Sequence, residues 1–103
     1  MKLINLTPHT IKLSTGEDIR PTGYVSRVNT TQVQVDLIRG IPVLVSNIST
    51  AVNLPEKEEG TCYIVPSVVR LMAPDRKDLL SPTRLIRDSN GAVVGCGAFE
   101  RNI

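Results

Sequence analysis

The stretch PDRKDLLSPTRLIRDSNGAVVGC, residues 74–96, holds the side chains with the most obvious capacity for chemistry. Its basic side chains are Arg76, Lys77, Arg84 and Arg87, and its acidic ones are Asp75, Asp78 and Asp88. Arginine presents a rigid fork of donors that matches phosphate and carboxylate oxygens. The stretch is therefore either a solvated loop whose charges pair with one another or a cradle in which aspartates orient arginines toward an anion.

We favour the cradle, because neighbouring apolar side chains should hold the stretch against the core. These side chains are Leu79, Leu80, Leu85 and Ile86. In an extended strand, residues three apart point to opposite faces, so Arg84 and Arg87 should diverge. We expect Arg87, next to Asp88, to face the ligand and Arg84 to pair with a local aspartate.

Three residues elsewhere are candidate ligand contacts, each with a plainer alternative. His9 is either a turn residue beside Pro8 or a ligand contact. Arg27, expected in the middle of a strand, faces either solvent or a pocket. Phe99 follows the glycines of GCGAF, so it either fills the core or stacks on a ring of the ligand.

Catalytic and metal-binding chemistry have weaker support. A pairing of His9 with Cys62 or Cys96 is conceivable, but the sequence shows no nucleophile elbow and no paired metal-ligand motif. Ion pairing with neighbouring cations should keep Asp75 and Asp78 ionised, which is a poor setting for a general acid. We therefore expect no catalytic residue, no metal and no cofactor.

Composition points to a single domain, residues 1–103, with an aliphatic core, since the only aromatic residues are Tyr24, Tyr63 and Phe99. The net charge of +2 lacks the basic excess of a general nucleic-acid binder, so we expect no binding to double-stranded nucleic acid. No run approaches the ~18 apolar residues of a membrane span. Both cysteines lie in strand-like apolar settings, and we expect them to be buried and reduced.

The pattern of elements predicts an α+β fold, with a mainly antiparallel sheet and one short helix before a C-terminal β-hairpin. Alternation over residues 24–38 indicates one long or two broken strands, and Arg39-Gly40 should turn the chain into the next strand. Ser67 is a candidate N-cap for a helix over SVVRLMA, and residues 76–82 should form a loop. Asn90-Gly91 predicts the turn of the final hairpin. So few elements should leave part of a sheet face uncovered, which favours a homo-oligomer.

Three motifs along most of the chain resemble a family of small phage and prophage proteins. They are INLTPHTIKL, YIVPSVVRLMAPDRKDLLSP and LIRDSNGAVVGC. The pattern is similar to the first Thoeris anti-defence family. This resemblance implies a protein of the host bacterial cytoplasm that sequesters a cyclic ADP-ribose isomer without cleaving it, with some members also holding cyclic oligonucleotides. It also implies a homo-oligomer assembled through dimers into a hexamer.

A nucleotide sponge needs arginines for the pyrophosphate, polar groups for the riboses and a ring for adenine. The residues predicted to bind the ligand are Asn5, His9, Arg27, Arg76, Arg84, Arg87, Asp88 and Phe99. Two other functions stay open. One is a phage structural or interaction protein without a small-molecule ligand, and the other is a small nucleotide hydrolase.

Overall fold

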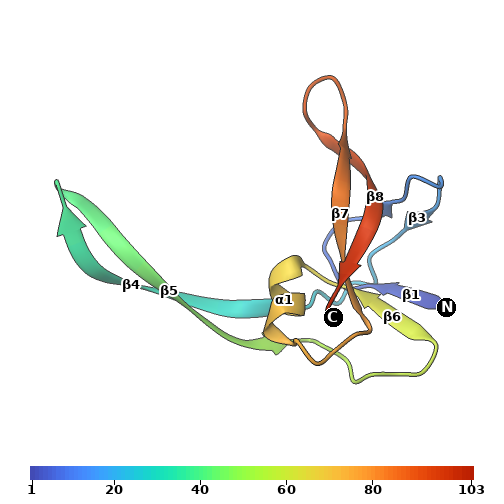
Figure 1. Ribbon diagram of the computed structural model, residues 1–103, viewed down its shortest axis with the longest axis horizontal. Helices are drawn as coiled ribbons and strands as arrows, with labels where there is room; N and C mark the ends of the chain where they lie inside the picture. The colour runs from blue at the N-terminus through green and yellow to red at the C-terminus, as the bar shows by residue number, and fades with distance from the viewer.

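The fold consists of a small body, a long two-stranded arm and a C-terminal hairpin (Figure 1). The computed structural model describes residues 1–103, with the side chains of residues 49 and 50 left aside. A four-stranded sheet of order β1-β6-β7-β8 forms the body: β1 (Lys2–Asn5), β6 (Thr61–Ile64), β7 (Leu79–Arg87) and β8 (Val93–Arg101). Two further pairs are β2 (Ile11–Lys12) with β3 (Asp18–Ile19), and β4 (Arg27–Ile38) with β5 (Ile41–Val52).

The predicted α+β class is confirmed, with antiparallel pairing in most of the strand residues and one short helix, α1 (Ser67–Met72), before the C-terminal hairpin β7–β8. The body sheet is nevertheless mixed, because β1 pairs with β6 and β6 with β7 in parallel. Parallel pairs join distant segments through crossovers, so no local turn signal announces them.

The two predicted hairpin turns are confirmed, and each has a local cause. Ile38 pairs with Ile41, so Arg39 and Gly40 form a two-residue turn with φ of 53° and 79°. Positive φ at both central positions matches the right-handed twist of the flanking strands. At the second turn, Gly91 has a φ of 81°, and its N–H donates to the Asp88 carbonyl.

Several local expectations were wrong. The residues that follow Asp78 belong to strand β7 rather than to a loop, because Leu79 and Leu80 pair in parallel with β6. Pro66, not Ser67, is the N-cap residue of α1, and it makes no side-chain capping bond. Arg27 begins β4 rather than lying in the middle of a strand.

The core lies where α1 packs against the body sheet and the base of the arm. The buried side chains of this core are those of Leu6, Tyr63, Val65, Val69 and Leu79. Val28 and Ala51, from the two arm strands, pack against this cluster and anchor the arm to the body. Leu85 and Ile86 stay exposed, so they do not hold the arginine-rich stretch against the core as expected.

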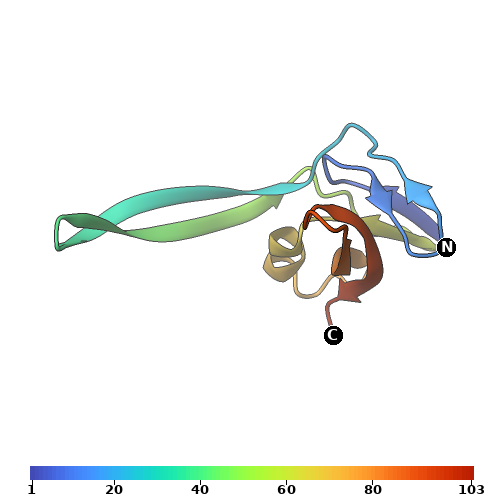
Figure 2. The same ribbon diagram turned by 90° about the horizontal axis from the view of Figure 1, so that it is seen from above.

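The molecule is extended for its length. Its radius of gyration is 16.4 Å, whereas a compact domain of this size has about 13 Å. Figures 1 and 2 show the reason, since the β4–β5 arm leaves the body as a twisted ribbon and the β7–β8 hairpin leaves it in another direction. The overall extents are 50 × 39 × 27 Å.

Candidate functional site

A pocket of about 280 Å³ lies between the C-terminal hairpin and the segment that contains β2. The residues around it are Thr10, Ile11, Lys12, Pro82, Leu85, Val93, Val94, Gly95 and Cys96. Lys12 is exposed and supplies a cation to an otherwise largely apolar wall. The pocket therefore offers an ammonium group beside a small hollow, which is suited to the phosphate of a ligand.

Close backbone approach holds the two walls of this pocket together. Leu13 bridges to Cys96, and the Ser14 N–H donates to the Cys96 carbonyl at 3.0 Å. A Cβ placed on Gly95 would lie 3.2 Å from the Lys12 carbonyl oxygen, so this position has little room for a side chain. Glycine at position 95 thus allows the hairpin to approach β2 closely.

Arg87 extends the cationic character of the pocket toward the hairpin end. Its partner across the hairpin is the pocket residue Val93, at a register shift between Ile86 and Arg87. One Nη1–H donates to the Gly91 carbonyl at 2.9 Å, which directs the guanidinium along the turn. The other N–H groups are without a partner among the described residues, so they are available to an anion.

Arg84 and Asp88 take different positions from those expected. Arg84 is exposed with a φ of 49°, an unusual backbone conformation for a side chain with a Cβ. The Asp88 carboxylate accepts the N–H groups of Asn90 and Ala92, at 2.8 and 3.0 Å. The expected pairing of Arg84 with a local aspartate is therefore absent from the described residues, and Asp88 stabilises its own turn.

Asn5 is the last residue of β1, and its side chain holds the loop that carries His9. The Asn5 amide donates to the His9 and Ile19 carbonyls at 2.8 and 2.9 Å, and its oxygen accepts from the Thr7 N–H and hydroxyl. Asn5 is 1% exposed, so its role in the structure is to hold the loop. His9 is exposed and directly precedes the pocket residue Thr10, which leaves its ring open to a ligand.

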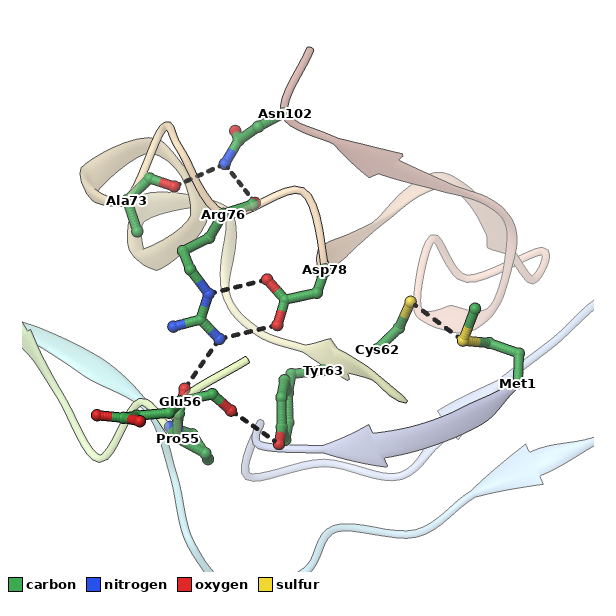
Figure 3. Close-up of polar contacts among 9 residues, drawn as sticks. All are labelled: Met1, Pro55, Glu56, Cys62, Tyr63, Ala73, Arg76, Asp78 and Asn102. Atoms are coloured by element: carbon green, nitrogen blue, oxygen red, sulfur yellow. Dashed lines mark hydrogen bonds and ion pairs between the residues drawn. The ribbon is translucent and has the colours of Figure 1, made fainter. Parts of the chain in front are cut away.

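Arg76 lies on another part of the body and is held by Asp78 (Figure 3). Its Nε and Nη2 donate to the two Asp78 oxygens at 2.9 and 2.8 Å, and Nη2 also donates to the Pro55 carbonyl. These charge-assisted bonds lower the pKa of Asp78 and raise the pKa of Arg76. The pair fixes the 53–60 loop against the body, and Nη1 alone is left for another partner.

The remaining predicted contacts, Arg27 and Phe99, are not among the residues that line the pocket. Arg27 is exposed at the base of the arm, and Phe99 is half-buried opposite Pro82 on the C-terminal hairpin. The structure thus gathers His9, Arg87 and the base of the hairpin near one pocket, whereas Arg27 and Arg76 lie on other elements. Their roles in ligand binding stay predictions.

A second pocket, of about 480 Å³, lies near the base of the arm and was not expected. Its walls are formed by Ile4, Leu6, Thr22, Tyr24, Asn53, Leu54, Pro55 and Tyr63. Two of the three aromatic residues of the chain meet here, with Tyr24 73% exposed and Tyr63 buried. The sequence shows that aromatic residues are few, but it gives no sign that Tyr24 and Tyr63 lie close together. Their proximity depends on the parallel pairing of β1 with β6, which no local pattern announces.

A buried arginine was also missed. Arg70 on α1 donates from Nε to the Ser81 hydroxyl at 2.9 Å and from Nη1 to the Asn102 amide oxygen at 3.1 Å. Asn102 in turn donates to the carbonyl of Arg70 in the last turn of the helix and to those of Ala73 and Arg76 beyond it. Because every buried donor and acceptor is satisfied here, this network ties α1 to β7 and β8 rather than serving a ligand.

The cysteines are free, with Cys96 buried and Cys62 only half-buried, so the expectation of full burial was wrong for Cys62. The Cys62 Sγ lies 3.6 Å from the Met1 Sδ (Figure 3). Among the described residues, no group of three or more His, Cys, Asp or Glu side chains is arranged to hold a metal ion. Within the same residues, no helix has the length and apolar character to cross a membrane.

Comparison with known proteins adds no relative to this picture. No known family model, no curated protein and no solved structure matches the chain.

Proposed function

We propose that the protein binds a small phosphate-bearing nucleotide of the cyclic ADP-ribose class and holds it without cleaving it. The observation that carries the proposal is the pair of exposed cations, Lys12 and Arg87, beside the pocket between β2 and the C-terminal hairpin. Both side chains offer donors to phosphate oxygens, and the apolar wall between them favours the less polar part of a nucleotide.

The size of the pocket indicates which part of the ligand it holds. At about 280 Å³ it is just below the ~300–1,000 Å³ of typical ligand sites. A pyrophosphate with part of a ribose fits this volume, while the remainder of the nucleotide extends toward His9 or a neighbouring copy. This agrees with a homo-oligomeric sponge in the host bacterial cytoplasm, dimer-based or hexameric, as the phage-family resemblance implies.

The direct test is incubation of the protein with cyclic ADP-ribose isomers, followed by removal of free ligand and heating. Intact nucleotide released by denaturation supports a sponge. Chemically altered nucleotide would instead indicate a hydrolase, and no uptake by any isomer would contradict the proposal. Cyclic oligonucleotides are included as a second ligand class.

Arg87→Ala tests whether the arginine beside the pocket contacts the ligand. One lost charge-assisted hydrogen bond corresponds to about 1.5–3 kcal/mol, so calorimetry should show affinity about ten-fold to a hundred-fold weaker. Arg39→Ala is the matched control, because Arg39 is an exposed arginine at the tip of the arm. If the two variants bind the nucleotide with equal affinity, Arg87 does not contact the ligand.

The second candidate function is that of a phage structural or interaction protein. The observation that favours it is the long, exposed and largely apolar β4–β5 arm, which suits contact with another protein. If the heating experiment shows that the protein takes up a nucleotide, ligand binding is its primary function. The arm would then serve assembly with other protein chains.

A further inference from the structure

Strand β7 contains a bend that its sequence does not announce. Arg84, in the middle of the strand, has a φ of 49°, in the left-handed region that residues with a Cβ rarely adopt. Thr83 pairs with Ala98 on one side of it. Leu85 pairs with Cys96 on the other side, in the same register. The bend is therefore not a β-bulge, because no residue is inserted at this point.

The bend changes which residues of β7 reach the pocket beside β2. Pro82 and Leu85 both line this pocket. They are three residues apart, and in a regular strand residues three apart point to opposite faces. The left-handed residue between them reverses the alternation, so both can face the same hollow. A regular strand through Arg84 would turn Leu85 away from the side that Pro82 faces.

Contacts fix the hairpin on both sides of the bend. On the body side, Ser81 is 2% exposed and its hydroxyl accepts from the Arg70 Nε at 2.9 Å. On the pocket side, Cys96 is buried and its carbonyl accepts from the Ser14 N–H at 3.0 Å. Backbone strain persists where the surrounding structure over-determines it. The conformation of Arg84 thus follows from joining the body to the wall of the pocket.

Neither crowding nor charge accounts for the bend. Gly97, which lies opposite Arg84, has no side chain, and even an added Cβ would lie 3.4 Å from the nearest Arg84 atom. The Arg84 side chain is exposed and makes no hydrogen bond or ion pair with the described residues. What is unusual at this position is the backbone.

We propose that Arg84 is a positioning residue of the pocket and acts through its left-handed backbone rather than through its charge. Its conformation directs residues 85–96, the outer hairpin, against β2 and so gives the hollow beside Lys12 its shape. The proposal rests on the proposed function for the identity of the ligand, whereas its structural part can be measured on the free protein.

Three substitutions at position 84 separate conformation from charge. Glycine adopts a positive φ freely and asparagine tolerates it, whereas the β-branched valine resists it. All three remove the charge. Arg84→Gly and Arg84→Asn should therefore keep the pocket, and Arg84→Val should move the outer hairpin away from β2.

Hydrogen exchange without ligand measures that movement. The Ser14 N–H, which donates to the Cys96 carbonyl, reports on the contact between β2 and the hairpin. Its exchange should be at least about ten-fold faster in Arg84→Val and within about three-fold of wild type in the other two variants. The Val65 N–H, which donates to the Leu80 carbonyl in the body, should stay protected in all three. Full protection of the Ser14 N–H in Arg84→Val would overturn the proposal.

Calorimetry with the cyclic ADP-ribose isomer retained in the heating experiment gives the functional measurement. Arg84→Val should bind it at least about ten-fold more weakly than wild type, and Arg84→Asn within about three-fold. An equal loss in both variants would mean that the guanidinium contacts the ligand, which contradicts a role of the backbone. If wild type retains no isomer, the proposed function fails, and the Ser14 exchange still decides whether Arg84 shapes the pocket.

Urea unfolding tests the strain with a variant that should keep the fold. Glycine normally weakens a strand, but at position 84 this cost is offset because glycine adopts a positive φ without strain. The urea midpoint of Arg84→Gly should therefore be at or above that of wild type. The control is Arg101→Gly, at an exposed strand arginine without a positive φ, and its midpoint should fall. An equal fall for both variants would show that position 84 is not strained and would overturn the proposal.

Discussion

Many of the polar side chains that suggested chemistry turn out to hold loops and strand ends in place. Asn5 fixes the loop to His9, Asp88 caps the final turn, and Asp78 holds Arg76 over the 53–60 loop. In each case the side chain satisfies backbone or charged groups that would otherwise be unpaired, which is where polar residues contribute most to stability. Arg87 and Lys12 differ from these because most of their donors face solvent.

Removal of the Asp78 charge should destabilise the fold without altering the pocket near Arg87. Asp78 is 6% exposed and accepts two hydrogen bonds from Arg76, so Asp78→Asn leaves a half-buried guanidinium without its counter-charge. We expect a loss of about 2 kcal/mol in the free energy of unfolding, measured with urea. Asp75→Asn, on the exposed residue three positions earlier, should change that energy by less than about 0.5 kcal/mol.

The same substitution should remove part of the acid sensitivity of the protein. The pKa of Asp78 is lowered in the folded state by the hydrogen bonds from Arg76, so folding is favoured by its ionised form. This stability is present above the ordinary carboxyl pKa of about 3.9 and is lost as the pH falls through the lowered value. The urea midpoints of wild type and Asp78→Asn should therefore converge as the pH falls below the ordinary carboxyl pKa of about 3.9, and a constant gap would contradict the assignment.

At the scale of elements, the sequence predicts contacts between neighbours in the chain and misses those between distant segments. The turns at Arg39-Gly40 and Asn90-Gly91 carry their own φ requirements, so both hairpins could be predicted. The β1–β6 and β6–β7 pairs have no such signal, so residues 79–82 of β7 were expected to lie in a loop. Pro82 is tolerated because β6 pairs only with Leu79 and Leu80, so one edge of β7 is free beyond them.

The candidate site was only partly visible for the same reason. Arg87 was predicted from its place beside the turn, whereas Lys12 was missed because β2 meets the hairpin only in three dimensions. The tyrosine-lined pocket likewise needs residues from β1, β6 and the loops at the arm base. Local patterns identify residue types suited to chemistry, but the parallel crossovers decide which of them become neighbours.

The close approach of β2 to the C-terminal hairpin can be tested with two neighbouring glycines. A Cβ at Gly95 would lie 3.2 Å from the Lys12 carbonyl, so Gly95→Ala should push the Lys12 segment outward and open the pocket. At Gly97 the nearest atom is the Arg84 carbonyl at 3.4 Å, an ordinary contact. We expect ligand affinity to fall several-fold for Gly95→Ala and to stay near wild type for Gly97→Ala. Calorimetry in which Gly97→Ala weakens binding as much as Gly95→Ala would contradict this geometry.

At the scale of the whole molecule, the body and the arm have separate tasks. The core cluster of Leu6, Tyr63, Val65, Val69 and Leu79 lies entirely in the body, and the pocket beside Arg87 is built from segments outside the arm. The outer arm contributes nothing to either, yet large apolar side chains such as Leu37, Ile38 and Ile41 are exposed on it. Ligand binding and self-association are therefore expected to be separable.

Shortening the arm tests that separation in one protein. Thr30 and Ile48 are paired across the ladder, so residues 31–47 can be replaced by Asn-Gly, which favours a tight hairpin turn at this point. Val28 and Ala51 remain to pack against the core, and the body should keep its fold by circular dichroism. We expect the shortened protein to be a monomer in light scattering. Its dissociation constant for the nucleotide should stay within about three-fold of wild type, because no residue that lines the pocket is removed. If the shortened protein is a monomer that no longer binds the nucleotide, the site needs a second copy of the chain. If it is a dimer that still binds, the pocket is intact and the arm is not needed for assembly.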